Sequence, residues 1–130
     1  MRAAVIALSM VPALSGCSAL AGGHESCLPR ISVSPSTAVA GGQITLASSD
    51  VCGADVPAEG WTVEVGHNGR ALVSHTTLEP FDGSFELTID LPRDFPEGLA
   101  FVHVDNWDYS SCDDTGSCAS IDVGFEVVAQ

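Results

Sequence analysis

The chain has 130 residues, enough for one domain of ordinary size. Its 17 aspartates and glutamates are opposed by only four arginines and no lysine, which gives a formal net charge of −13 at pH 7. A surface this acidic repels phosphate backbones and anionic lipid headgroups, so we exclude nucleic acid as a partner.

The N-terminal residues have the pattern of an export signal. Met1 and Arg2 form a minimal positive region, and residues 3–14 follow without a charge. Twelve residues are too few to cross a hydrocarbon core of about 30 Å as a helix. The stretch ends on Leu14-Ser15-Gly16-Cys17, which resembles the lipobox of bacterial lipoproteins. The resemblance implies that Cys17 receives a diacylglyceryl thioether and that a signal peptidase cuts before it.

This interpretation divides the chain into a signal peptide (1–16), a lipidated N-terminus with a short tether (17–26) and a folded domain (27–130). We expect the acyl chains to hold the protein at the membrane, on the extracytoplasmic side of a bacterial envelope. Only Ser18 to Ser26 separate the lipid from Cys27, a reach of about 30 Å when fully extended.

Four cysteines remain after Cys17, and an even number in an exported chain predicts two disulfides. Cys27 and Cys52 lie symmetrically about a predicted turn at residues 37–42, and Cys112 and Cys118 lie symmetrically about Thr115. Each pair would therefore face one another on antiparallel neighbours, which favours the pairs 27–52 and 112–118. A zinc site is disfavoured because the sequence contains no Cys-x-x-Cys.

The rest of the domain alternates apolar and polar residues, which is typical of strands separated by turns. Asn68-Gly69 predicts a tight hairpin, because both residues tolerate positive φ. We predict seven strands, at 31–34, 43–47, 61–67, 71–78, 85–91, 100–104 and 121–127. Seven short strands in about 100 residues and no helical periodicity predict an antiparallel β-sandwich.

Several short sequence motifs lie in or beside these strands: Val33-Ser34-Pro35, Gly41-Gly42-Gln43-Ile44-Thr45-Leu46, Trp61-Thr62-Val63-Glu64-Val65, Asp82-Gly83-Ser84-Phe85 and Pro96-Glu97-Gly98. Through them, residues 31–130 resemble a bacterial immunoglobulin-like domain. The resemblance implies a sandwich fold and leaves function open. Ala100 stands where such domains often carry the tyrosine of a tyrosine corner, and the predicted disulfides would not join the two sheets.

Motifs for catalysis are missing from the sequence. There is no Gly-x-Ser-x-Gly elbow, and the four cysteines after Cys17 are expected to be oxidised, so none can act as a nucleophile. The chain carries His24, His67, His75 and His103, and we expect the last three to be ordinary surface or half-buried side chains; the alternative is a metal site that they share. We predict no enzymatic activity, no cofactor and no metal.

One stretch combines acids and large aromatics just before the last strand. Its candidate binding residues are Asp105, Trp107, Asp108, Tyr109, Asp113 and Asp114. Three interpretations are open: a solvated loop whose aromatics cap the sandwich, a calcium site, or a rigid aromatic contact for a ligand. The carboxylate spacing does not match a calcium-binding loop. Because acids flank Trp107, we expect at least one of the two rings to be substantially exposed.

These observations predict a membrane-anchored envelope lipoprotein that acts as a non-enzymatic binding or structural surface module. Candidate ligands are an envelope protein or a glycan. The alternative is an accessory subunit or carrier for an envelope enzyme or transporter.

Overall fold

The computed structural model describes residues 27–110 and 120–130. Within them the chain is all-β. The strands are β1 (Ser32–Ser34), β2 (Thr37–Val39), β3 (Gln43–Ser48), β4 (Trp61–His67), β5 (Arg70–Thr77), β6 (Phe85–Asp90), β7 (Gly98–Val104) and β8 (Asp122–Val128). None of the described segments forms a helix of the length and apolarity that crossing a membrane requires.

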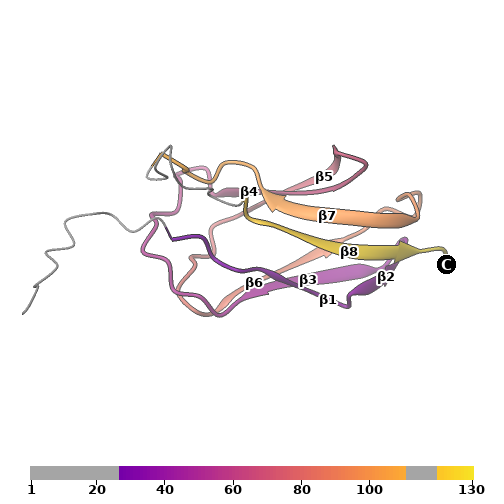
Figure 1. The fold of residues 1–130 in the computed structure, drawn as a ribbon, viewed down its shortest axis with the longest axis horizontal. Helices are drawn as coiled ribbons and strands as arrows, with labels where there is room; N and C mark the ends of the chain where they lie inside the picture. The colour runs from indigo at the N-terminus through magenta and orange to yellow at the C-terminus, as the bar shows by residue number, and fades with distance from the viewer. Residues whose placement is uncertain (1–26, 111–119) are drawn as a thin grey trace, which may run out of the picture.

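The strands form two sheets with a shared core, consistent with the predicted β-sandwich (Figure 1). One sheet has three strands in the order β1-β3-β6, and the other has five in the order β2-β8-β7-β4-β5. Alternation along the strands sends every second side chain inward. In β4, Trp61, Val63 and Val65 are buried while Thr62 and Glu64 face the outer side.

All seven predicted strands are present, and the Asn68-Gly69 hairpin is confirmed by positive φ at both residues (50° and 74°). The prediction of one turn across residues 37–42 is wrong. Thr37–Val39 form β2, which pairs in parallel with β8 at the edge of the five-stranded sheet, and the turn begins only at Ala40. Local sequence gives little sign of β2, because it is three residues long, buries only Ala38 and pairs with the end of the chain.

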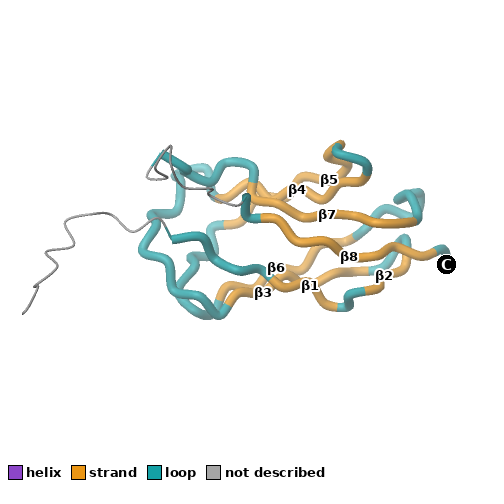
Figure 2. The backbone as a smooth tube through the Cα atoms, in the orientation of Figure 1, coloured by secondary structure: helices purple, strands orange, loops and turns teal. Residues whose placement is uncertain are grey.

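The chain therefore switches sheets between β1 and β2 (Figure 2). It then returns to the first sheet as β3, which pairs with β1 in antiparallel register. Cys27 and Cys52 each lie five residues beyond the register pair Ser32 and Ala47. This places the two cysteines opposite one another, and the predicted disulfide Cys27–Cys52 is present, with 5.5 Å between its Cα atoms. The second predicted pair, Cys112 and Cys118, lies outside the described residues.

The two ends of the sandwich differ in their connections (Figure 1). We call one the hairpin end; it holds the turn at 40–42, the Asn68-Gly69 turn and residues 91–97. The other, the disulfide end, holds Cys27–Cys52 and the connections at 49–60, 78–84 and 105–110. Of the predicted binding residues, Asp105, Trp107, Asp108 and Tyr109 lie at or beside the disulfide end.

Candidate functional site

Trp107 belongs to the core of the disulfide end. Its side chain is only 7% exposed and stacks on Trp61, with 4.8 Å between ring centroids. Its ring also meets Phe81 edge-on at 5.4 Å, and Phe81 in turn stacks on Phe85. Such pairs contribute beyond the area they bury. Trp107 therefore closes the aromatic end of the core.

Tyr109 is half-buried, and its hydroxyl accepts a hydrogen bond from the backbone N–H of Ile121 at 3.0 Å. The expectation that at least one of the two rings is substantially exposed is therefore wrong. Its premise, that the flanking acids must stay hydrated, is satisfied in another way. Asp105 and Asp108 point outward while the Trp107 ring points inward.

Asn106 fixes the position of this connection, and the sequence analysis did not single it out. Its side-chain carbonyl accepts the N–H of Thr62 at 2.7 Å, and its amide donates to the carbonyl of Gly60 at 2.9 Å. The Asp105 N–H also donates to the Thr62 carbonyl at 2.8 Å. These bonds tie residues 105–106 to the start of β4, where Trp61 lies, and so keep the Trp107 ring stacked on the Trp61 ring.

The carboxylates predicted to share this loop are separated. Asp108 accepts the Ser110 N–H at 2.8 Å, and hydrogen bonds from the Ser110 side chain and backbone lower the pKa of its carboxyl, so it is ionised at neutral pH. Asp105 instead faces His103 on the outer side of the sheet, with 3.8 Å between Oδ1 and Nε2. Asp113 and Asp114 lie outside the described residues. The described carboxylates therefore do not converge on one calcium ion.

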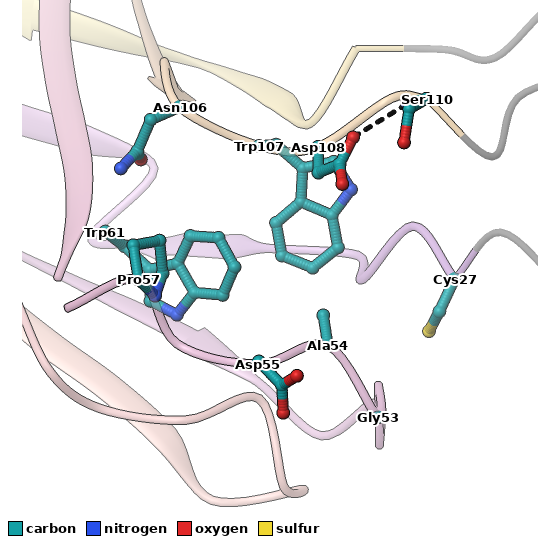
Figure 3. A pocket seen from close by; sticks show the side chains of 10 residues that line it. All are labelled: Cys27, Gly53, Ala54, Asp55, Pro57, Trp61, Asn106, Trp107, Asp108 and Ser110. Atoms are coloured by element: carbon teal, nitrogen blue, oxygen red, sulfur yellow. Dashed lines mark hydrogen bonds between the residues drawn. The ribbon is translucent and has the colours of Figure 1, made fainter.

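A pocket of about 910 Å³ opens between this connection and the 53–57 segment (Figure 3). Both indoles contribute to it, Asp55 and Asp108 supply carboxylates, and Cys27 lies at its margin. The indole N–H of Trp61 is buried and has no hydrogen-bond partner within residues 27–110 and 120–130. Sequence reasoning missed Asp55, since a single exposed acid in a loop carries no signal. The full lining is Cys27, Gly53, Ala54, Asp55, Pro57, Trp61, Asn106, Trp107, Asp108 and Ser110.

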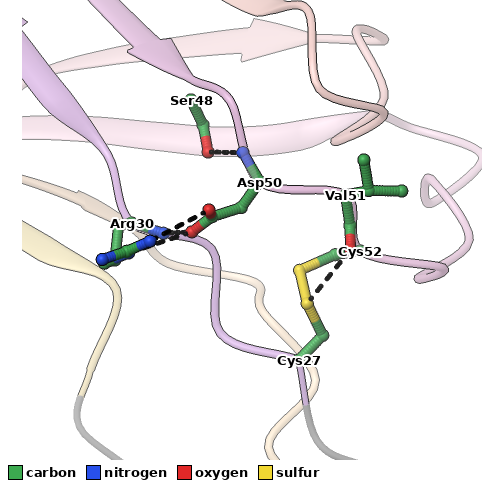
Figure 4. The surroundings of a disulfide bond; sticks show 6 residues. All are labelled: Cys27, Arg30, Ser48, Asp50, Val51 and Cys52. Carbon is green, nitrogen blue, oxygen red and sulfur yellow. Dashed lines mark hydrogen bonds and ion pairs between the residues drawn. A yellow bond between two sulfur atoms is a disulfide. The ribbon is translucent and has the colours of Figure 1, made fainter.

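The disulfide braces one side of this end (Figure 4). The Arg30 N–H donates to the Asp50 carboxylate at 2.8 Å, and the guanidinium lies 3.4 Å from the same oxygen. The Arg30 backbone bond, followed by its side chain, lowers the pKa of Asp50. Cys52 itself donates its N–H to the carbonyl of Phe81 at 2.8 Å. The segment that follows Cys27 is thus joined covalently and by hydrogen bonds to the end of β3.

The three histidines in the described residues lie on three different strands. His67 is half-buried at the end of β4, His75 is exposed on β5, and His103 is half-buried on β7, in accord with the expectation of surface or half-buried positions. Within the described chain they do not share a site. His24 and the predicted lipidation residue Cys17 lie outside it.

The pocket therefore offers two carboxylate acceptors, with the edges of two largely buried indoles in its wall, to a ligand at the disulfide end. Comparison with known proteins adds no identification: no protein-family model, curated protein or solved structure matches the chain.

Proposed function

We propose that the chain is a membrane-anchored envelope lipoprotein whose β-sandwich acts as a non-enzymatic binding module. The anchor rests on the lipobox Leu14-Ser15-Gly16-Cys17 behind a short apolar segment. Two or more acyl chains on Cys17 would give stable attachment on the extracytoplasmic side of a bacterial envelope.

We infer that the sandwich is immunoglobulin-like. The order β1-β3-β6 corresponds to strands A, B and E of that fold, and β8-β7-β4-β5 corresponds to G, F, C and C′. The short β2, which leaves the β1 sheet to pair with β8, then plays the part of a split first strand. In this family, function is usually carried by the loops at one end.

The observation that carries the binding role is the pocket at the disulfide end. It is lined by the ionised Asp108, by Asp55 and by the buried Trp61 indole, whose N–H has no partner in the described part of the chain. A ligand with hydroxyl groups would donate hydrogen bonds to the two carboxylates and lie against the indole edges, which favours a glycan. The negative net charge disfavours an anionic one.

Pocket position and anchor are linked through Cys27. The predicted tether, residues 18–26, ends at this cysteine, which lines the pocket. The pocket would therefore face the membrane and lie within about 30 Å of it. A cell-wall glycan or the membrane-proximal part of an envelope protein would be within reach.

The anchor is tested by Cys17→Ser. The full chain should move from the detergent phase to the aqueous phase when the envelope is extracted with a phase-separating detergent, whereas Cys27→Ser should leave partitioning unchanged. Equal partitioning of Cys17→Ser and the unchanged protein would refute lipidation.

The pocket is tested by co-sedimentation of the purified full chain with isolated cell-wall glycan. Asp55→Asn with Asp108→Asn removes both pocket charges, and Asp94→Asn with Glu97→Gln removes two exposed charges at the hairpin end. Binding should fall only with the pocket pair. No binding by the unchanged chain, or equal losses with both pairs, would defeat the glycan proposal.

A further inference from the structure

The outer face of the five-stranded sheet brings together three side chains that the pocket does not use. Glu64 on β4 and His103 on β7 are direct partners in the antiparallel register. Asp105 follows His103 by two residues and projects to the same side. Nε2 of His103 lies 3.2 Å from Oε2 of Glu64 and 3.8 Å from Oδ1 of Asp105. One ligand atom from each residue lies within 4.8 Å of the other two.

These separations suit a shared metal ion. Ligands about 2.0–2.2 Å from a tetrahedral zinc ion lie roughly 3.3–3.6 Å from each other. The His103–Glu64 distance is just below that range, the His103–Asp105 distance is just above it, and all three atoms lie within 4.8 Å of one another, so side-chain rotation would close the site. Asp105 is the most exposed of the three, at 59%, and has the freedom to rotate.

Neighbouring residues hold the His103 imidazole and the backbone at Asp105 in place. The Phe101 ring stacks beside His103, with 5.6 Å between centroids and 26° between planes. The N–H of Asp105 donates a hydrogen bond to the carbonyl of Thr62, two residues before Glu64 in β4. Glu64 and His103 are thus set by neighbouring strands, which position a site more precisely than loops, and Asp105 follows directly after β7.

The charge of the cluster favours a divalent cation. Two carboxylates and a neutral imidazole carry a charge of −2, and within residues 27–110 and 120–130 no arginine is ion-paired with either carboxylate. Glu64 and His103 are only 23% and 27% exposed, so solvent screens their interaction incompletely. A protonated His103 would offset one of the two negative charges, whereas a divalent ion offsets both.

We propose that Glu64, His103 and Asp105 bind a zinc-type divalent cation, with a fourth position open to water or to a partner's ligand. An imidazole with two carboxylates suits zinc and similar transition ions, whereas calcium prefers six to eight oxygens. The site is separate from the pocket and from the proposed glycan binding. It also differs from the shared histidine site weighed in the sequence analysis, because its ligands are one histidine and two carboxylates.

The test is calorimetric titration of the purified full chain with zinc chloride in metal-free buffer. The unchanged chain should bind one equivalent. His103→Gln and Glu64→Gln should each weaken binding by about tenfold or more, since even outer-shell changes at metal sites cost 10–100-fold. His75→Gln, which removes an exposed histidine on β5, is the matched control and should bind as the unchanged chain does. Glycan co-sedimentation should be the same with and without zinc, which separates failure of this site from failure of the pocket.

Three outcomes would overturn the proposal: no saturable zinc binding, equal affinity in His103→Gln, or equal loss in His75→Gln. The melting temperature of each variant in metal-free buffer shows whether it is folded. Should Glu64→Gln or His103→Gln fail to fold, Asp105→Asn at the most exposed ligand replaces it, and zinc affinity unchanged by that substitution would also count against the site.

Discussion

At the hairpin end, the Asn68-Gly69 turn joins two neighbouring strands and residues 40–42 and 91–97 cross between the sheets, whereas at the disulfide end long connections fold over the core and carry a disulfide and two stacked indoles. The Asn68-Gly69 turn is determined by its own two residues, both at positive φ. The position of Trp107 is determined by Trp61, Phe81 and Asn106, which come from distant parts of the sequence. The comparison teaches that local turn chemistry is enough for the Asn68-Gly69 hairpin, whereas the pocket lies where the structure depends on long-range packing.

The largest expected effect is at Trp107. Replacing Trp107 by Ala should lower the free energy of unfolding by about 3–5 kcal/mol, because it empties the aromatic end of the core. Chemical denaturation measures the change. Leu78→Ala at the same end is the control, since Leu78 is 67% exposed and should change stability by less than about 0.5 kcal/mol. Equal effects of the two substitutions would mean that Trp107 is not a core residue.

The disulfide should come next. Cys27→Ser with Cys52→Ser opens a covalent loop with a sequence separation of 25, which in the loop-entropy model costs roughly 3.5 kcal/mol. The measurement is denaturation of the unchanged and doubly substituted chains without reductant. Peptide mapping without reduction should recover Cys27 joined to Cys52. A peptide that joins Cys27 to Cys112 or Cys118 would contradict the register of β1 and β3.

A smaller effect is expected at the hairpin end. Gly69 has φ of 74°, and an added Cβ would meet no atom within 4 Å, so Gly69→Ala adds only backbone strain. Left-handed backbone costs a non-glycine residue about 1–2 kcal/mol. Thermal unfolding monitored by circular dichroism measures it. A loss as large as that of Trp107→Ala would show that this turn also depends on long-range packing.

The smallest expected effect is pH dependence, and it is concentrated at the disulfide end. Asp50, Asp82 and Asp108 all have lowered pKa values, caused by hydrogen bonds from Arg30, Ser84 and Ser110 respectively. A lowered folded-state pKa gives stability that is present above the unfolded pKa of about 3.9 and is lost as the pH falls through the lower folded value. The melting temperature should therefore fall modestly below about pH 4. Asp50→Asn should reduce this dependence, whereas Asp94→Asn, at the hairpin end, should not.

Alternation and turn residues sufficed to predict the seven strands other than β2 and the Asn68-Gly69 hairpin, because each signal lies within a few neighbouring residues. Symmetric spacing found Cys27 and Cys52, although the chain between them visits the other sheet and does not form a simple turn. The features that the sequence did not predict depend on contacts between residues far apart in the chain. β2 depends on β8, Asn106 on the start of β4, and Asp55 on a connection that folds beside Trp107. Glu64 and Asp105 likewise became neighbours of His103 only through the pairing of β4 with β7.

The disulfide also determines how a mechanical load would enter the domain. β1 has only three residues, so a pull on the chain before Cys27 would otherwise peel it from β3 one hydrogen bond at a time. Cys27 is instead joined to Cys52, which is buried and bonded through its N–H to Phe81. Force applied from that side passes through the covalent bridge into the core and does not act along β1. The weakest strand of the three-stranded sheet is thereby shielded from tension.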